Sequence, residues 1–214
     1  MFSSSCTVYG QPEHPPVRET DPIKPAESPY GNTKQISEEI IRDAAKAFPQ
    51  INAVLLRYFN PIGAHPSTLI GELPNGVPMN LMPYITQTAA GIRESLSVFG
   101  DDYNTPDGTC IRDYIHVEDL AAAHRLALEK LGKYNGCVNL GTGIGSSVRE
   151  IITAAEKVSG WRCPVEYAPR RPGDPAKLFA DNRKAGEILG WRPRYTAIEE
   201  IIETAWKWET NRKY

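Results

Sequence analysis

The sequence contains little cysteine and histidine, and neither residue recurs at a short spacing. The four cysteines are scattered along the chain, at Cys6, Cys110, Cys137 and Cys163. Such spacing indicates neither a zinc site nor a disulfide framework. The four histidines form no metal-binding pattern on one helix. We therefore expect free, mostly buried thiols and no metal site.

An excess of basic residues and a long apolar run are also missing. The 24 lysines and arginines are balanced by 26 acidic residues, which gives a net charge of -2. This balance argues against a nucleic-acid partner and against binding to a membrane surface. No apolar stretch reaches membrane-spanning length, and the first residues lack the charged and apolar regions of a signal peptide. The expected location is the cytoplasm, with no membrane partner.

A glycine-rich dinucleotide loop does not occur either. Neither Gly-x-Gly-x-x-Gly nor Gly-x-x-Gly-x-x-Gly follows a strand anywhere in the sequence. The segment 141–145 comes nearest, but its third glycine is one place early and Ser146 takes the required position. We interpret 141–145 as a tight turn before a helix that Ser147 caps, with Glu150 completing a capping box.

Alternating strand and helix patterns predict an α/β fold. Residues 2–10 are expected to form a strand that ends in hydroxyl side chains and a turn. A surface loop and a helix to about residue 48 follow, with Ile36 and Ile40 on the apolar face of that helix. A strand over 53–58 is predicted to be buried on both faces, because its apolar residues are consecutive rather than alternating. Strand, helix and strand in this order imply a parallel sheet.

The later part of the chain continues this alternation. The last helix is predicted to begin at Thr196, with Glu199 completing a capping box, and the helix before it to stop at Gly190. The other predicted elements are a long loop over 60–78, helices at 81–93, 118–131 and 181–189, and strands at 96–99, 112–117, 137–140 and 165–168.

Tyr30 and Lys34 are the strongest candidates for chemistry. They follow Ser28 as a helix cap and Pro29 at the first helical position, and their spacing places phenol and ammonium on one helical face. A neighbouring cation favours the ionised phenol, which then acts as a base near neutral pH. The same spacing also arises by chance, with a half-buried tyrosine beside a solvated lysine. Ser5, at the end of the preceding strand, favours the catalytic reading, because it can bond the same substrate oxygen.

In this order and spacing, Ser5, Tyr30 and Lys34 resemble the Ser-Tyr-Lys triad of the extended short-chain dehydrogenase/reductases. The longer blocks 55–66 and 112–117, with 139–143, are similar to the members of that family that interconvert UDP-glucose and UDP-galactose. The resemblance runs over essentially all 214 residues and corresponds to the later part of such an enzyme. It implies a partial Rossmann-type parallel sheet, its N-terminal half missing, with a smaller C-terminal α/β substrate domain.

The resemblance also implies how the chain is divided. Residues 1–60 would be the remaining part of an NAD-binding Rossmann domain, to which the segment 109–142 returns. Residues 61–214 would form mainly a UDP-sugar-binding domain. The full-length protein is expected to be a homodimer, whereas the isolated fragment is expected to be inactive.

Catalytic roles follow from the resemblance at the matching positions. Tyr30 would take the proton from the sugar 4-hydroxyl while the hydride on that carbon passes to the cofactor, NAD. Ser5 would bond the same oxygen, and Thr7 would lie beside the sugar. Lys34 would hold the nicotinamide ribose, and Tyr58 would contact the cofactor. The 4-keto sugar would then turn over and receive the hydride on its other face.

The same resemblance implies a firm grip on the nucleotide of a UDP-hexose. Arginine suits this work because its planar fork bonds two phosphate oxygens at once. The alternative is that Arg112 forms an ordinary ion pair with Asp113 or Glu118, and that Arg171 is solvated. The residues implied to bind substrate, besides Ser5 and Thr7, are Phe59, Asn60, Asn80, Leu81, Phe99, Arg112, Arg171, Asp174 and Leu178.

Two departures and two alternatives remain open. Met79 replaces a polar residue of many relatives, and Leu178 is intermediate between the large residue that excludes N-acetyl sugars and the small ones that admit them. Acceptance of UDP-GlcNAc therefore stays open. A nucleotide-sugar 4,6-dehydratase would need an Asp-Glu pair where Cys6 and Thr7 stand. A non-catalytic chain that binds UDP weakly, or completes its fold with a partner, is the other alternative.

Overall fold

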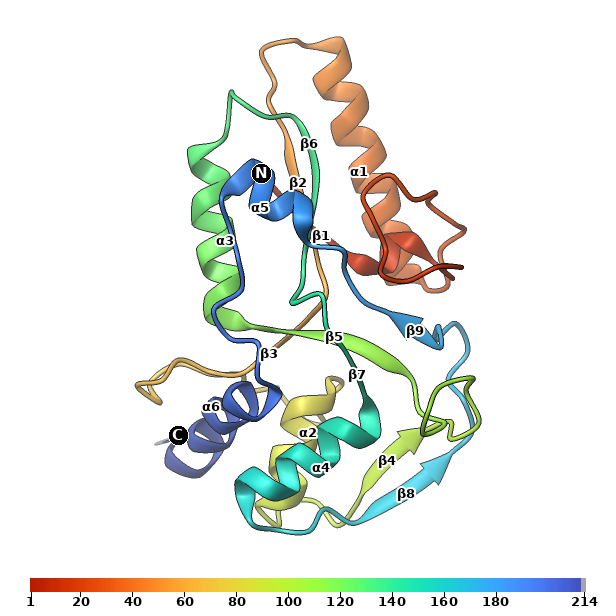
Figure 1. Ribbon diagram of the computed structural model, residues 1–214, viewed down its shortest axis with the longest axis vertical. Coiled ribbons are helices and arrows are strands. Elements are labelled where there is room, and N and C mark those ends of the chain that lie inside the picture. The colour runs from red at the N-terminus through yellow and green to blue at the C-terminus, as the bar shows by residue number, and fades with distance from the viewer. Residues whose placement is uncertain (213–214) are drawn as a thin grey trace.

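A computed structural model describes residues 1–212, which form an α/β fold of parallel strands and covering helices (Figure 1). The helices are α1 (Pro29–Ala47), α2 (Leu81–Ala89), α3 (Val117–Glu129), α4 (Val148–Ser159), α5 (Arg183–Leu189) and α6 (Ile198–Asn211), with a 3-10 helix η1 (Cys6–Tyr9). The strands are β1 (Phe2–Ser5), β2 (Val54–Tyr58), β3 (Asn60–Ile62), β4 (Leu96–Phe99), β5 (Ile111–His116), β6 (Gly136–Leu140), β7 (Gly145–Ser147), β8 (Val165–Ala168) and β9 (Lys177–Leu178).

The upper part of Figure 1 is a three-stranded parallel sheet in the order β1-β2-β6. In its centre, Val54, Leu55 and Leu56 are each at most 1% exposed, which confirms a strand covered on both faces. Helices α3 and α5 pack against one face through a shared apolar cluster, and α1 contacts β1 and η1. The predicted strand, helix and strand order therefore does produce parallel pairing.

The lower part of the molecule is organised around β5. This strand pairs in parallel with β3 and β9 and antiparallel with β7, while β4 and β8 form a separate parallel pair. Helices α2, α4 and α6 pack together beside these strands around one large apolar core, which includes Ile85, Ile151 and Ile201. The elements around β1-β2-β6 thus form one wall of a candidate site, at the ends of β1 and β2. The elements around β5 form the opposite wall.

Several helix boundaries agree with the sequence signals. The Ser28 side chain accepts a hydrogen bond from the Gly31 amide at 3.0 Å, with Pro29 at the first helical position of α1. Ser147 and Glu150 form the predicted capping box of α4. Gly190 ends α5 with φ of 67°, a conformation that glycine adopts readily. Side chains that hydrogen-bond their own backbone thus set these boundaries locally.

Other boundaries differ from the prediction. The capping box at Thr196 is wrong, because α6 begins at Ile198 without a side-chain cap and Glu199 pairs with Lys157 instead. The opening strand ends at Ser5, and the next residues form η1. The segment 60–78 is not wholly a loop, because its first residues form β3, which pairs with β5. The Glu199 pair and the pairing of β3 depend on partners distant in sequence, whereas η1 is capped locally by Ser5.

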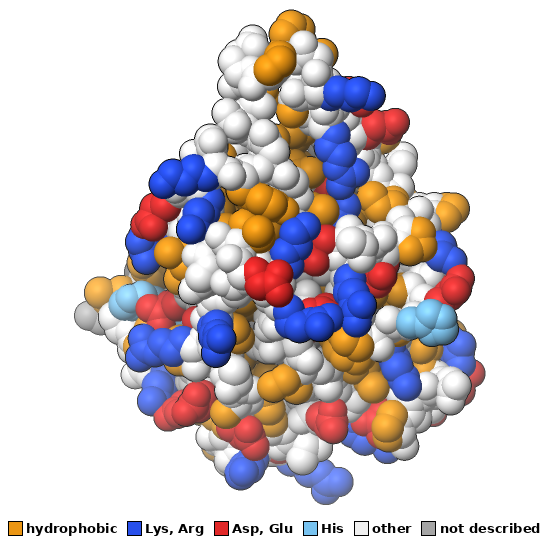
Figure 2. Space-filling model, turned by 45° about the horizontal axis from the view of Figure 1, so that its top comes forward, with side chains coloured by type: hydrophobic (Ala, Val, Ile, Leu, Met, Phe, Trp, Pro, Cys, Tyr) orange, Lys and Arg blue, Asp and Glu red, His pale blue; other side chains and the backbone are white. Residues whose placement is uncertain are grey.

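Helix α1 is attached to the sheet in an unusual way. Within this helix, which the structure describes throughout, the buried residues are Gly31 and Glu38. Its apolar residues Ile36 and Ile40 are 46% and 61% exposed. Figure 2 shows further apolar side chains on the projecting end of the molecule, which Figure 1 identifies as the end of α1 and the loop after it. Polar contacts, rather than an apolar face, therefore join α1 to the sheet.

The cysteines are free, with Cys6, Cys110 and Cys163 buried and Cys137 half-buried, which confirms the expected state of the thiols. Among residues 1–212, no helix combines the length and apolar character needed to cross a membrane.

Candidate functional site

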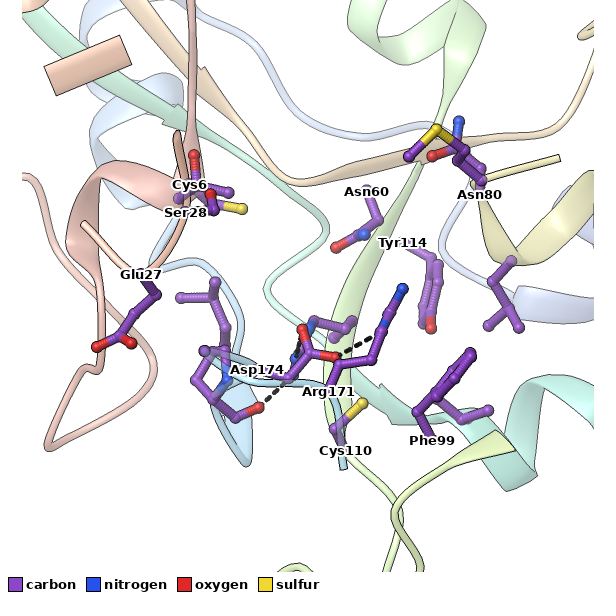
Figure 3. A pocket seen from close by; sticks show the side chains of 18 of the residues that line it. Cys6, Glu27, Ser28, Asn60, Asn80, Phe99, Cys110, Tyr114, Arg171 and Asp174 are labelled. Carbon is purple, nitrogen blue, oxygen red and sulfur yellow. Dashed lines mark hydrogen bonds and ion pairs between the residues drawn. The ribbon is translucent and has the colours of Figure 1, made fainter. Parts of the chain in front are cut away.

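A cavity of about 350 Å³ lies where the two groups of elements meet (Figure 3). Its walls come from segments far apart in sequence: η1, the start of α1, β3, the start of α2, β4, β5 and the loop 171–175. Figure 3 shows Cys6 and Ser28 on one side, Asn60 and Tyr114 on the other, and Arg171 between them. The fold thus joins the end of β1 to the loops of the lower part in a single site.

Most residues implied to bind substrate line this cavity. The structure brings together Thr7, Asn60, Asn80, Leu81, Phe99, Arg112, Arg171, Asp174 and Leu178. Ser5 and Phe59 lie outside its lining. Phe59 is 3% exposed and packs in an apolar cluster with Val8 and Tyr9, because neighbouring strand residues point in opposite directions and Asn60 takes the cavity side. The expectation that the Phe59 side chain contacts a substrate is therefore not met by this geometry.

Two guanidinium groups meet at one carboxylate. Arg112 Nη2 lies 3.4 Å from Asp174 Oδ1, and Arg171 Nε donates to Asp174 Oδ2 at 3.0 Å. Arg112 Nη1 also donates to the carbonyls of Ile111 and Pro175, at 2.8 and 2.7 Å. Among residues 1–212, neither Nη atom of Arg171 has a hydrogen-bond partner, so both can donate to an anion. The alternative pairing of Arg112 with Asp113 or Glu118 is wrong, whereas the Arg171 side chain is 56% exposed in addition to its pair with Asp174.

Asp113 does not pair with Arg112 and has a structural role instead. Its carboxylate is fully buried and accepts hydrogen bonds from the amides of Thr142, Gly143 and Ala180, at 2.8, 3.0 and 3.1 Å. Burial raises the pKa of Asp113 above its ordinary value. The carboxylate holds the turn 141–143 and the segment after β9 against β5, which supports the interpretation of that turn as structural.

Tyr30 and Lys34 share one side of α1, as the spacing predicts. Lys34 Nζ lies 5.5 Å from the centroid of the Tyr30 ring and donates to the Ser3 carbonyl at 2.8 Å. The Tyr30 side chain is half-exposed. A Cβ added at Gly31 would lie 3.4 Å from the Thr7 carbonyl, so the first turn of α1 packs closely against η1. The phenol and the ammonium therefore lie next to the end of β1.

Ser5 and Tyr58 occupy the ends of the two neighbouring strands, where they are opposite one another in register. Ser5 is buried, and its Oγ accepts from the Thr7 amide at 3.2 Å and from Thr7 Oγ1 at 3.0 Å. Tyr58 is half-buried; burial, followed by the charge of Tyr30, raises the pKa of its phenol. A hydroxyl, two phenols and an ammonium are thus gathered at one sheet end.

These groups fit the nicotinamide-ribose end of a dinucleotide. An ammonium and hydroxyl-bearing side chains at the carboxyl ends of parallel strands are suited to ribose hydroxyls, and such strand ends are where open α/β sheets bind ligands. Tyr30 and Lys34 on α1, with Tyr58 at the end of β2, supply the phenols and the ammonium here. For the pyrophosphate, residues 1–212 present no loop with the Gly-x-Gly-x-x-Gly spacing ahead of a helix.

The sequence interpretation missed several lining residues. Tyr114 lines the cavity two residues after Arg112 on β5, so strand alternation was a signal that would have found it. Cys6, Glu27 and Cys110 also line the cavity, from η1 and two loops without a periodic pattern. Burial raises the pKa of Cys6 to about 12, and burial also raises the pKa of Cys110. Both thiols are therefore protonated near neutral pH.

Comparisons with known proteins show the family to which the chain belongs. The family model described as GDP-mannose 4,6 dehydratase matches residues 1–205. The chain belongs to this family, which is part of the extended short-chain dehydrogenase/reductases, and its α/β fold is of the Rossmann type.

Among individual proteins, the chain is similar to UDP-glucose 4-epimerases. It is 53% identical over 213 residues to the one from Bacillus subtilis, covering 99% of this chain and 62% of that protein. It is 50% identical over 211 residues to the one from Homo sapiens, covering 98% of this chain and 60% of that protein. The chain therefore spans about three fifths of the length of these relatives.

Solved structures give the same result. The structure of UDP-glucose 4-epimerase from Bifidobacterium longum in complex with NAD+ and UDP is similar, with a TM-score of 0.94 and 48% identity over 98% of this chain and 62% of that one. The enzyme from Stenotrophomonas maltophilia with bound NAD and formylated UDP-arabinopyranose has a TM-score of 0.93 and 50% identity, with the same coverage.

Proposed function

We propose that this chain carries the UDP-sugar site and the Ser-Tyr-Lys triad of an NAD-dependent UDP-glucose 4-epimerase. The observation that carries the proposal is the single cavity that joins the paired Arg112 and Arg171 to Thr7, next to the first turn of α1. The relatives and solved structures named above supply the substrate class. In this reading the diphosphate lies at the arginines and the hexose at the strand end.

In the proposed reaction, the phenolic oxygen of Tyr30 acts as the base that takes the proton of the sugar 4-hydroxyl. Ser5 bonds the same oxygen, and Lys34 holds the ribose of the cofactor beside it. NAD, which Lys34 and Tyr58 would hold, would supply the acceptor and later the donor of the hydride at the sugar C4. The resulting 4-keto sugar turns within the cavity, so that hydride return on its other face, with the proton returned by Tyr30, gives the epimer.

Turning the sugar requires a firm hold on the nucleotide and a loose hold on the hexose. The free donors of Arg171, with Asn60 and Asn80 on the facing wall, provide the firm end. Thr7 and Leu178 also line the cavity, with short or apolar side chains that give the hexose few polar contacts.

Dehydration, the reaction in the description of the family model, is less well supported. Elimination of water needs an acid and a base beside the sugar. At the matching positions the cavity presents Cys6 and Thr7, and burial raises the pKa of the Cys6 thiol to about 12. Neither side chain exchanges a proton readily at neutral pH, so epimerisation is the proposal.

Titration of UDP into the 214-residue chain tests the nucleotide site. One UDP should bind per chain, and Arg171→Gln should weaken binding about tenfold or more, because the guanidinium fork is lost. Arg170→Gln is the matched control, since Arg170 pairs with Asp102 outside the cavity lining. Failure of the wild-type chain to bind UDP would remove the nucleotide site from the proposal.

Conversion of UDP-galactose to UDP-glucose tests the reaction. We expect little turnover and little stable NAD binding by the isolated chain. Turnover should appear when the part of the Bacillus subtilis relative that the chain does not match is added as a second polypeptide. Tight, stoichiometric NAD binding by the chain alone would contradict the proposed division of the cofactor site.

We also propose that the assembled enzyme is a homodimer that acts in the cytoplasm. Unpaired cysteines are typical of a reducing compartment, which supports this location. The exposed apolar residues Ile36 and Ile40 on α1 offer a surface that a second copy of the chain can cover.

A further inference from the structure

The strongest contact between α1 and the sheet is made by one buried carboxylate. Glu38 is 0% exposed, and its Oε1 accepts from Ser4 Oγ at 2.5 Å and from Arg57 Nε at 2.8 Å. Its Oε2 accepts from Arg57 Nη2 and from Arg42 Nη2, each at 2.6 Å. Ser4 lies on β1 and Arg57 on β2, so a single side chain ties the helix to both strands.

Glu38 and two of its three partners, Ser4 and Arg57, are close in sequence to residues of the proposed active site. Glu38 lies one turn after Lys34 and two turns after Tyr30, on the same side of α1. Ser4 directly precedes Ser5 on β1. Arg57 directly precedes Tyr58 on β2, and Ser4 and Arg57 are paired in register. The carboxylate therefore spans the three elements that carry the triad and the second phenol.

The far side of Arg57 is also fixed. Its guanidinium carbon lies 4.8 Å from the centroid of the Tyr9 ring, and Tyr9 Oη donates to Asn139 Oδ1 at 2.6 Å. Asn139 is paired with Arg57 in register on β6. Burial opposes the charged form of Glu38, but the hydrogen bonds and charge of Arg57 outweigh it and lower the pKa of the carboxyl. The pair is thus ionised and held from both sides.

Stability alone does not require such a pair. Buried ion pairs can often be replaced by apolar side chains of similar volume without loss of stability. Apolar packing, however, has little directional preference, whereas hydrogen bonds fix the angles between their groups. The rotation and depth of α1 therefore depend on directional contacts: those of Glu38, the bond from Lys34 Nζ to the Ser3 carbonyl, and the close approach of Gly31 to η1.

We propose that Glu38 is a positioning residue for the epimerisation: through Arg57 and Ser4 it sets the placement of Tyr30 and Lys34 over the end of β1. This inference rests on the proposed function. Glu38 does not line the cavity, so it acts on the reaction through α1 and not through the substrate.

The test compares Glu38→Gln with Glu39→Gln, the matched change at the exposed neighbour on the same helix. In Glu38→Gln, amide hydrogen exchange across residues 30–38 should be about tenfold faster or more, while UDP affinity stays within about twofold of wild type.

In the complemented turnover assay, kcat of Glu38→Gln should fall about 100-fold with little change in KM, because a displacement of catalytic groups by about 1 Å is that costly. Glu39→Gln should match wild type in every measurement. If a folded Glu38→Gln variant keeps the kcat of the wild type, the positioning role is overturned, even when its amide hydrogens exchange faster.

A second variant covers the case in which Glu38→Gln does not fold. Glu38→Met combined with Arg57→Met removes both charges and keeps apolar volume, so the chain should fold and bind UDP as wild type does. Its kcat should still fall about 100-fold, and an unchanged kcat in this double variant also overturns the proposal.

If the complemented assay shows no turnover with the wild-type chain, the proposed function has failed rather than the role of Glu38. In that case the exchange comparison of Glu38→Gln with Glu39→Gln still decides whether Glu38 holds α1.

Discussion

At the scale of single residues, the site separates binding from chemistry. Arg112 and Arg171 meet at Asp174 in the cavity, whereas Tyr30 lies outside the cavity lining, beside Lys34. Because these groups come from different elements, a change in one should leave the other intact. This separation allows the proposed base to be tested independently of the nucleotide site.

Tyr30→Phe removes the phenolic oxygen and keeps the ring. In the complemented assay we expect turnover to fall by about a thousandfold or more, because the sugar hydroxyl loses its base, while UDP affinity is nearly unchanged. Steady-state kinetics and UDP titration measure the two effects. Tyr167→Phe, at an exposed tyrosine on β8, is the control and should behave as wild type. Unaltered turnover in Tyr30→Phe would remove Tyr30 from its proposed role.

At the scale of elements, β5 does most to build the site. Its alternation directs Arg112 and Tyr114 to the cavity, while Asp113 between them binds the turn 141–143. At its end, His116 caps α3 by accepting from the Glu118 amide at 3.1 Å. One strand therefore supplies a cavity wall, a buried clamp and a helix cap.

The buried His116 makes stability depend on pH. Its Nδ1 accepts from a backbone amide, its Nε2 lies 3.0 Å from Thr204 Oγ1, and its ring stacks on Tyr195 at 3.9 Å between centroids. This geometry suits the neutral ring, and burial lowers the pKa of His116. The unfolded chain then binds a proton that the folded chain does not, so stability should fall as pH falls below about 6.5.

Urea unfolding at pH 7.5 and pH 5.5 checks this expectation. The wild-type midpoint should be lower at pH 5.5, and the difference should shrink in His116→Asn, whose amide oxygen can still accept from the Glu118 amide. His14→Asn is the control, because His14 is exposed on the loop before α1 and should leave the pH dependence unchanged. An identical pH dependence in wild type and His116→Asn would show that this ring does not contribute.

At the scale of the whole molecule, the exposed side of α1 is the feature that stands apart. Ile36, Ile40 and Phe48 are 46%, 61% and 54% exposed, and α1 projects from the rest of the molecule (Figures 1 and 2). A helix whose apolar residues face outward is typical of an interaction surface. This is the basis for the proposed homodimer.

Ile40→Glu tests that surface. Analytical ultracentrifugation should show a concentration-dependent dimer for the wild-type chain and a monomer for Ile40→Glu, because a charge at this position would be buried without a partner. Leu128→Glu, at an exposed leucine on α3, is the matched control and should still dimerise. A wild-type chain that stays monomeric at high concentration would contradict the proposal.

Local signals in the sequence determined much of this protein. The Ser28 cap and the Ser147–Glu150 box bond neighbouring backbone, so they could be identified without the fold. The consecutive apolar residues of β2 likewise indicated a strand buried on both faces. The spacing of Tyr30 and Lys34 likewise fixes their shared helical side, because four residues make about one turn.

Only the tertiary structure decided the features that depend on distant partners. It placed Asp174 between Arg112 and Arg171, moved Phe59 into the core, and left Ile36 and Ile40 exposed on α1. No local pattern encodes such choices, because the energy of a buried group depends on what the rest of the chain brings next to it. The sequence by itself determined the elements and the side chains able to do chemistry, and the packing of distant segments decided which of those side chains share one cavity.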